Sequence, residues 1–247
     1  MIEQYVNKIF NMDCLKMMKQ LPDNCIDLII TSPPYNSGGK NLGYQPNSTV
    51  GQKFYGEYDD NMEEKEYSDW IINVIGECLR VSRYVFWNMQ FIRNTRSSIF
   101  NLQNIYKQNI KDIFIWEKQS LSNITAKQGG LAKGWEYVFM LGRDNLSTFN
   151  YNNFPENGYV PNIKTWYKNI YFKEHHATFT IEMCNYFINY FTKKNDIVFD
   201  PFLGMATVCL SAVNLGRRFI GTEISKQYFD IATERIKTAQ SQGRLDL

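Results

Sequence analysis

Residues 27–52, DLIITSPPYNSGGKNLGYQPNSTVGQ, contain the feature that decides the fold, a strand that ends abruptly. Residues 26–31 (IDLIIT) form a nearly continuous apolar run, which is typical of a strand buried on both faces of a parallel sheet. The two prolines that follow have no N–H group to donate to a sheet ladder, so the strand must end before them. A tyrosine and a long glycine-containing stretch come next, and we expect residues 36–60 to form a mobile loop.

A second pattern, of strand, loop and helix, lies in DIVFDPFLGMAT, residues 196–207. Asp200 ends the expected strand, where α/β sheets bind ligands, and Gly204 allows backbone to approach a ligand. The next strand, 218–224, carries Glu223, and an acidic residue at this place accepts hydrogen bonds from ribose hydroxyls. A single loop glycine is no phosphate cradle, so the pattern favours a nucleoside cofactor without pyrophosphate, such as S-adenosylmethionine. The alternative is that Asp200 only caps the following helix.

The apolar periodicity of the remaining chain alternates between the helical and the strand type. It predicts strands at 83–88, 112–118 and 135–141, and helices at 66–80, 89–104, 181–193, 207–216 and 225–241. We expect Gly216 and Ser225 to cap helices, and residues 143–172 to be irregular or to form an inserted lobe. Alternating strands and helices at both ends of the chain indicate an α/β fold with a doubly wound, mostly parallel sheet.

The composition bounds the class of protein. A chain of 247 residues suits one large α/β domain, and an aromatic content of 15% suits an aromatic-rich core or stacking on flat ligands. The net charge of +2 is too small to indicate a nucleic-acid partner by itself. Five widely spaced cysteines predict free thiols, and no zinc-ligand spacing is present. Without a signal-peptide pattern or a long apolar run, we expect a cytoplasmic protein that does not enter membranes.

Several side chains in the middle of the chain have two competing interpretations. Trp116 and Trp135 lie at expected strand positions, where core packing is favoured over stacking on bases. A set of basic residues is compatible with a phosphate-contacting face or with a scattered distribution. These residues are Arg93, Arg96, Lys107, Lys111, Lys118, Lys127 and Lys133.

Together the two motifs resemble the amino-methylating DNA methyltransferases, and in particular their permuted (beta-type) group, in which SPPY or DPPY precedes DPFxGxGT. The matching residues are Ser32-Pro33-Pro34-Tyr35 and Asp200-Pro201-Phe202-Leu203-Gly204. Further blocks match in the same order over nearly the whole chain: 11–36, 115–118, 135–141, 175–179 and 215–236. The resemblance implies a seven-stranded type of sheet, one methyltransferase domain over residues 1–247, and a target-recognition insertion at 143–172.

The resemblance also implies S-adenosylmethionine as the cofactor. By their position in the family's motifs, the implied cofactor-binding residues are Asp13 (adenine), Glu223 (ribose), Cys14, Asp200, Pro201, Phe202, Gly204, Thr207, His176 and Thr178. Two departures stand out. Met205-Ala206 stands where Ser-Gly is usual, and Thr180 stands where proline is usual. Because alanine cannot take up every glycine conformation, these departures bear on cofactor affinity and not on the fold.

The expected catalytic residues are Ser32, Pro33, Pro34 and Tyr35. The exocyclic amino group of a base is a poor nucleophile because its lone pair is delocalised into the ring, so the site needs hydrogen-bond acceptors rather than a strong base. The Ser32 hydroxyl and the Pro33 carbonyl supply acceptors, and the Tyr35 ring offers a face for a base taken out of the helix.

The resemblance leaves the substrate and some partners open. Ser32 and HATF favour cytosine-N4 methylation, and adenine-N6 methylation is the alternative. An RNA or protein-glutamine methyltransferase is disfavoured by the motif order, and an inactive methylase-like nucleic-acid-binding or partner subunit is a further alternative. Double-stranded DNA is the expected partner. A homodimer and a cognate restriction endonuclease are compatible with the resemblance, although no residue specifies either.

Overall fold

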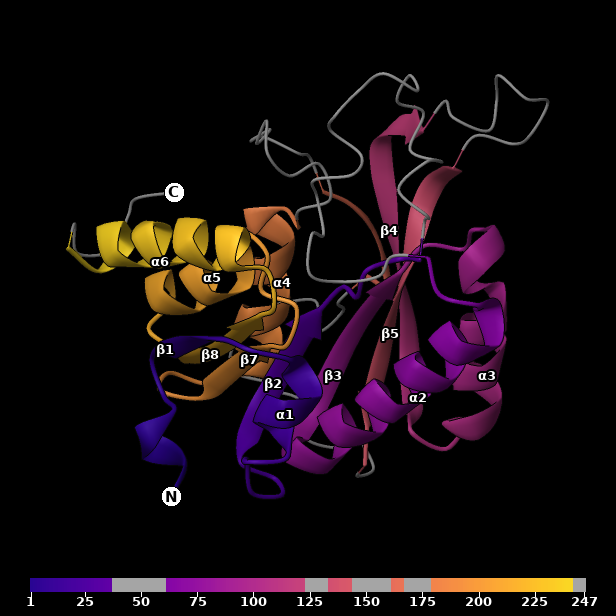
Figure 1. The fold of residues 1–247 in the computed structure, drawn as a ribbon. Helices are drawn as coiled ribbons and strands as arrows, with labels where there is room; N and C mark the ends of the chain where they lie inside the picture. Colours follow the sequence, from indigo (N-terminus) through magenta and orange to yellow (C-terminus); the bar gives the residue numbers. More distant parts are fainter. Residues whose placement is uncertain (37–60, 123–132, 144–160, 167–178, 242–247) are drawn as a thin grey trace, which may run out of the picture.

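The computed structural model describes residues 1–36, 61–122, 133–143, 161–166 and 179–241, which form one eight-stranded sheet flanked by helices (Figure 1). The strands are β1 (Lys8–Asn11), β2 (Ile26–Thr31), β3 (Ser82–Met89), β4 (Ile110–Ser122), β5 (Lys133–Gly142), β6 (Ile163–Thr165), β7 (Ile197–Asp200) and β8 (Arg218–Glu223). Their order is β1-β8-β7-β2-β3-β5-β4-β6. Only β5 is antiparallel to its neighbours, so the expected doubly wound, mostly parallel sheet is confirmed.

Two groups of helices cover the two faces of the sheet (Figure 1). The helices are α1 (Cys14–Met18), α2 (Glu64–Val81), α3 (Arg96–Ile105), α4 (Ile181–Phe191), α5 (Thr207–Asn214) and α6 (Lys226–Ser241). The first three pack into one hydrophobic core and the last three into the other. In β2, Leu28 and Ile30 face the α4–α6 core, whereas Ile29 faces the α1–α3 core. The apolar run of this strand is therefore continuous because both of its faces are buried.

The sheet has a switch point between β7 and β2. From β7 the chain runs through α5 on one face to β8, and from β2 it runs through α2 on the other face to β3. The connections that leave the carboxyl ends of these two neighbouring strands therefore diverge. Such a divergence opens a crevice outside the sheet, which is where open α/β sheets bind their ligands.

Several boundaries differ from the sequence-based expectation. Residues 89–104 are not one helix, because β3 extends to Met89 and α3 begins only at Arg96. The short elements β1 and α1 had no periodic signal of their own. Within 143–172, residues 163–165 form an eighth strand, and Trp166 is buried in the α4–α6 core, so this part of the expected insertion belongs to the main fold. The segment 37–60, expected as a mobile loop, lies outside the described residues.

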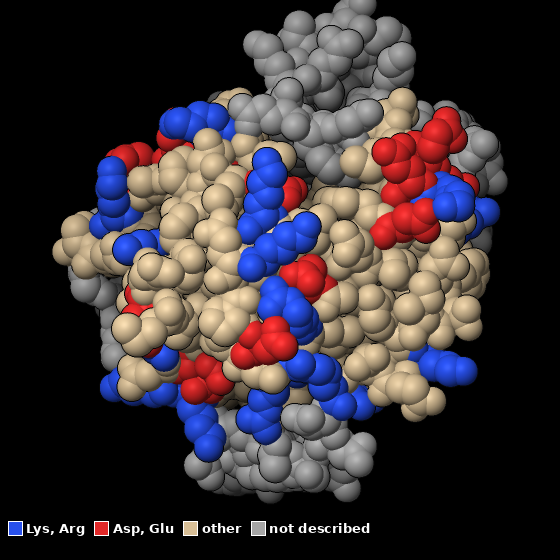
Figure 2. Space-filling model, turned by 60° about the horizontal axis from the view of Figure 1, so that its bottom comes forward, with Lys and Arg blue, Asp and Glu red and all other residues tan. Residues whose placement is uncertain are grey.

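The structure also decides between the two interpretations of several side chains. Trp116 is core, as expected, but Trp135 is 39% exposed, so that core assignment is wrong. Lys118 of β4 pairs with Glu136 of the neighbouring strand β5, whereas Lys107 and Lys111 lie near the start of β4, at the opposite end of that strand. Figure 2 shows Lys and Arg interleaved with Asp and Glu on the underside of the view in Figure 1. These lysines therefore do not make one basic face. No described helix is long and apolar enough to cross a membrane.

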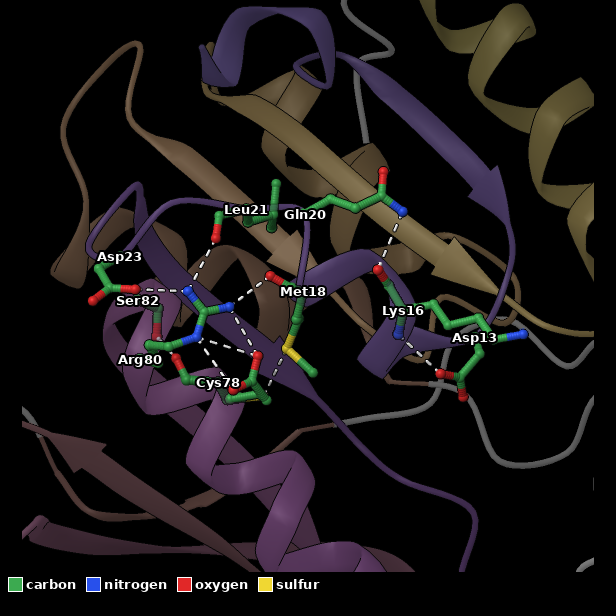
Figure 3. Close-up of polar contacts among 10 residues, drawn as sticks. Asp13, Lys16, Met18, Gln20, Leu21, Asp23, Cys78, Arg80 and Ser82 are labelled. Carbon is green, nitrogen blue, oxygen red and sulfur yellow. Dashed lines mark hydrogen bonds and ion pairs between the residues drawn. The ribbon is translucent and has the colours of Figure 1, made fainter.

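Arg80, near the end of α2, holds α1 against the rest of the fold (Figure 3). Its guanidinium donates to the carbonyl oxygens of Met18 (2.6 Å) and Leu21 (3.0 Å) at and beyond the end of α1. It also pairs with Asp23 at 2.7 Å and Glu77 at 2.8 Å. The planar fork of an arginine suits this multiple donation, and it satisfies carbonyls that a helix end leaves unpaired.

Replacing Arg80 tests whether this arginine acts as a clamp, that is, whether its contacts hold α1 against the rest of the fold. Arg80→Ala should lower the free energy of unfolding by about 2 kcal/mol, because backbone acceptors and two carboxylates lose a charged donor. Urea unfolding followed by circular dichroism measures the change. Lys65→Ala is the control, since Lys65 forms an exposed pair with Asp69 and should cost no more than about 0.5 kcal/mol. Equal losses in the two variants would show that Arg80 is no clamp.

Candidate active site

A cavity of about 210 Å³ lies at the switch point, outside the carboxyl ends of β2, β7 and β8. Every predicted site residue that the structure describes lines it: Asp13, Cys14, Ser32, Pro33, Pro34, Tyr35, Asp200, Pro201, Phe202, Gly204, Thr207 and Glu223. His176 and Thr178 lie outside the described residues. Segments from both ends of the chain therefore meet in one place, because β2, β7 and β8 are parallel and their carboxyl ends lie at the same edge of the sheet.

A buried hydrogen bond joins the two motifs. The Thr31 hydroxyl at the end of β2 donates to Asp200 Oδ1 at the end of β7 over 2.7 Å. The same oxygen accepts the Phe202 N–H at 3.1 Å, which turns the chain after β7. Burial raises the pKa of the Asp200 carboxyl to about 7, although both hydrogen bonds oppose that rise. Asp200 is therefore more than a helix cap, because it ties the two strand ends together.

Glu223 organises the loop on the other side of Asp200. Its Oε2 accepts the Gly204 N–H at 2.8 Å, and its Oε1 accepts the Ser225 N–H at 2.9 Å, just before α6 begins. The position of this carboxylate in the cavity wall, at the end of β8, fits the expected contact with ribose hydroxyls.

The loop between β7 and α5 accommodates the unusual Met205-Ala206 pair. Gly204 and Ala206 both have left-handed backbone, with φ of 48° and 61°. This conformation costs an alanine about 1–2 kcal/mol, but the Ala206 methyl group is fully buried, and that burial offsets about 1 kcal/mol. Alanine therefore adopts left-handed backbone here. The other departure, Thr180, caps α4 by accepting the Met183 N–H at 3.1 Å, so it replaces a turn residue with a helix cap.

The start of α1 forms another wall of the cavity. Asp13 caps this helix by accepting the Lys16 N–H at 3.0 Å (Figure 3), and Cys14 is buried beside it. Burial raises the pKa of the Cys14 thiol, so the side chain packs as a small neutral group. Asp13 lines the cavity, and its contact with adenine remains an expectation from the sequence.

The Ser-Pro-Pro-Tyr loop is held by neighbours on α2 and by its own asparagine. Tyr67 of α2 donates to the Pro34 carbonyl at 2.7 Å. Asn36 bonds both the N–H (2.7 Å) and the carbonyl (2.8 Å) of Met62. These bonds fix the loop just before the segment that the structure does not describe. Because Tyr67 occupies the Pro34 carbonyl, the Pro33 carbonyl is the better candidate for meeting a substrate.

The Tyr35 hydroxyl reaches three polar neighbours. It lies 2.9 Å from Ser32 Oγ, 3.0 Å from Asn88 Oδ1 on β3, and 3.0 Å from Glu136 Oε2 on β5. Glu136 in turn pairs with Lys118 on β4. Burial, with the Glu136 carboxylate second, raises the pKa of Tyr35 well above its usual value, so the phenol stays protonated. Sequence reasoning missed Asn88 and Glu136, although each is a polar residue next to an apolar run of its strand, which is the signal that marks them.

The charges that line the cavity have one sign. Its described lining includes three carboxylates, Asp13, Asp200 and Glu223, and no lysine, arginine or histidine. Apolar and aromatic groups complete the wall, among them Trp70 and Phe202, whose ring centroids lie 5.7 Å apart. Such a lining suits a cationic nucleoside better than a phosphorylated one, because phosphates call for basic groups or a row of backbone N–H donors.

Comparison with known proteins gives one family. The profile of a family described as DNA methylase (N6_N4_Mtase) matches residues 26–234. The type II methyltransferase M.BglII of Bacillus subtilis is 28% identical over an alignment of 269 positions, which covers 93% of this chain and 69% of that protein. The DNA adenine methyltransferase YhdJ of Escherichia coli is 28% identical over an alignment of 260 positions, which covers 94% of this chain and 83% of that protein.

Solved structures share the fold. The PvuII DNA methyltransferase, titled cytosine-N4-specific, has a TM-score of 0.70 at 16% identity, with coverage of 95% of this chain and 91% of that one. TTHA0409 of Thermus thermophilus, titled a putative DNA modification methylase and solved in complex with S-adenosyl-L-methionine, has a TM-score of 0.64 at 18% identity, with coverage of 97% and 96%. At these identities the likeness is one of fold alone.

The buried Asp200 carboxyl gives a pH prediction. Its pKa is about 7 in the folded protein against 3.8 ordinarily, so the folded state holds the proton more tightly. The stability that this provides is complete below pH ~4 and is lost as the pH rises to ~7. Asp200→Asn keeps the acceptor oxygen without the charge. Its free energy of unfolding, relative to wild type, should therefore increase from pH 5 to pH 8.

Urea unfolding of both proteins at each pH unit measures this difference. Asp69→Asn is the matched control, because it makes the same chemical change at an exposed carboxylate, and its difference from wild type should not follow the same curve. If the Asp200→Asn difference were constant over this range, the carboxyl would titrate alike in the folded and unfolded states.

Proposed function

Because this chain belongs to the DNA methylase family of N6 and N4 methyltransferases, we propose that it transfers a methyl group from S-adenosylmethionine to an exocyclic amino group in DNA. The observation that carries the proposal is the single cavity in which the Asp200 loop and the Ser-Pro-Pro-Tyr loop meet, joined by the Thr31–Asp200 hydrogen bond. One loop offers features of a nucleoside site, and the other offers acceptors for an amino group.

The described lining fits S-adenosylmethionine, which when bound supplies a methyl group on a positively charged sulfonium. The carboxylates suit that positive charge and the hydroxyls of a nucleoside. In this proposal Glu223 holds the ribose and Asp13 the adenine. The residues of the loop after β7, together with Cys14, surround the remainder: Asp200, Pro201, Phe202, Gly204 and Thr207. Contacts from His176 and Thr178 remain predictions from the sequence.

The Ser-Pro-Pro-Tyr loop would bind the amino group that is methylated. Ser32 Oγ and the Pro33 carbonyl accept its hydrogens, which draws its nitrogen toward tetrahedral geometry and makes the lone pair available. The Pro33 backbone is stiff and therefore holds its oxygen in place. Tyr35 presents a ring face to the base, and stacking returns part of the few kcal/mol needed to flip a base from the helix. The nitrogen would react as a neutral amine through its lone pair, and the proton that it loses after methylation would pass to solvent, so no strong base is required.

We favour cytosine-N4 as the target because the motif begins with Ser32, and keep adenine-N6 as the alternative. The relatives do not decide between them, since one is titled an adenine methyltransferase and a structural neighbour is titled cytosine-N4-specific. The order of the motifs, with residues 32–35 before 200–204, supports membership of the permuted group.

The remaining parts of the proposal concern DNA and partners. We propose that residues 36–60 close over the site, and that 143–172, apart from the strand and Trp166 in the main fold, read the target sequence. The substrate would be double-stranded DNA. Assembly as a homodimer and action beside a cognate restriction endonuclease also remain proposals, supported by the resemblance alone.

The test is to incubate the purified protein with S-adenosylmethionine and unmethylated DNA, and to identify the digested nucleosides by mass spectrometry. N4-methylcytosine is the expected product, and N6-methyladenine would support the alternative base. Tyr35→Ala is the control, since it should abolish methyl transfer while its affinity for S-adenosylmethionine, measured by calorimetry, stays within about threefold of wild type. Absence of both products from several DNA sources would refute the proposed activity.

A further inference from the structure

The contacts of the Tyr35 hydroxyl determine the direction of its hydrogen bonds. Asn88 Oδ1 and Glu136 Oε2, both 3.0 Å away, are acceptors that cannot donate. The Asn88 amide has a fixed orientation, because its Nδ2 donates to the Tyr137 carbonyl at 2.9 Å. The single Tyr35 hydrogen is therefore directed toward this acceptor pair and away from Ser32.

The direction of the Ser32 hydrogen bond follows. Tyr35 donates its hydrogen to the acceptor pair. The 2.9 Å contact between the Tyr35 and Ser32 hydroxyls therefore requires Ser32 to donate and Tyr35 to accept. The Ser32 hydrogen is thereby engaged with Tyr35. Ser32 lines the cavity, and only its lone pairs remain for a ligand there.

Lys118 strengthens this arrangement. Its ammonium pairs with Glu136 Oε1, and the Glu136 side chain is only 5% exposed. A carboxylate attracts the Tyr35 hydrogen more strongly than the amide oxygen of Asn88 does. Asn88 is a second acceptor, and it directs the Tyr35 hydrogen the same way. Two acceptors compete for one hydrogen, so the direction is set twice.

We propose that Glu136 and Asn88 are positioning residues that act through Tyr35 to keep the Ser32 hydroxyl a hydrogen-bond acceptor toward the cavity. The inference rests on the proposed function and deepens it. A base with an amino group at the reacting position can donate a hydrogen bond, which a Ser32 lone pair accepts. A base with a carbonyl there, such as uracil or hypoxanthine, offers only an acceptor and meets another acceptor. The device therefore makes the site choose bases with an amino group.

Substitutions can reverse the chain of hydrogen bonds. In Glu136→Gln, Lys118 takes the only amide oxygen, so the amide nitrogen faces Tyr35 as a donor. Tyr35 still has Asn88 as its acceptor, and in Asn88→Leu it still has Glu136, so each single variant should lose less than about tenfold in kcat. In the double variant Tyr35 can donate only to Ser32, which frees the Ser32 hydrogen for the cavity. The double variant should lose at least about tenfold more than the product of the single losses.

A triple variant separates direction from structural damage. Adding Lys118→Met to the double variant releases the glutamine oxygen to accept from Tyr35, and kcat should recover by about tenfold, although another polar contact has been removed. A second readout is the ratio of dissociation constants for duplexes with the natural base or its carbonyl analogue (uracil for cytosine, hypoxanthine for adenine) at the methylated position. That ratio should shift toward the analogue in the double variant and return in the triple variant.

Dissociation constants for S-adenosylmethionine and melting temperatures, measured for every variant, verify that the cofactor site and the fold persist. Purely multiplicative losses, no recovery with Lys118→Met, or an unchanged base ratio would overturn the proposal. Neutron diffraction of the deuterated wild-type protein tests the direction itself. Deuterium on Ser32 pointing to Tyr35 is expected, and deuterium on Tyr35 pointing to Ser32 would contradict the inference whether or not the protein methylates DNA.

Discussion

The hydrogen bond from Thr31 to Asp200 is the contact on which the rest of the site depends. It links residues 169 positions apart, at the carboxyl ends of β2 and β7, the two neighbouring strands on either side of the switch point. On one side of it, Phe202 N–H and the Glu223 carboxylate shape the loop that enters α5. On the other side, β2 gives way to the Ser-Pro-Pro-Tyr loop. Together with the pairing of β2 and β7, this link sets the positions of the two loops relative to each other.

The bond also defines two halves of one cavity with different chemistry. The half around Asp200 and Glu223 is acidic and partly aromatic, which suits a cationic nucleoside. The half around Ser32 and Tyr35 is rich in acceptors, and the Glu136–Lys118 pair behind it is neutral overall. An amino group needs acceptors, and a positively charged methyl donor needs negative surroundings, so each half matches one of the two reactants of an amino-methylation. Low dielectric surroundings strengthen both preferences.

The sequence predicted the parts of the fold that have strong local signals. Long apolar strands and amphipathic helices such as β2 and α2 were found, and the Pro-Pro pair and the Asp-Pro-Phe-Leu-Gly loop both lie at the cavity. The short elements β1, α1 and β6 were not predicted, because three to five residues give no periodic pattern and their stability comes from contacts with distant segments. Trp135 was assigned to the core because a strand pattern does not show where the sheet extends past its covering helices.

Residues whose role depends on partners far along the chain were also beyond local patterns. Asn88 and Glu136 became site residues only when β3, β5 and the Tyr35 loop were seen side by side. Ala206 looked unfavourable in a glycine position, yet burial of its methyl group offsets much of the left-handed strain. In both cases the deciding energy lies in tertiary packing rather than in residue type.

A crystal structure of the protein with S-adenosylmethionine would test the central claim, that the two loops form one site for cofactor and amino group, most directly. The account predicts the ribose hydroxyls at about 3 Å from the Glu223 carboxylate, the adenine beside Asp13, and the methyl-bearing sulfur directed toward Ser32 and Tyr35. Cofactor bound elsewhere, or bound with its sulfur directed away from the Ser-Pro-Pro-Tyr loop, would contradict it.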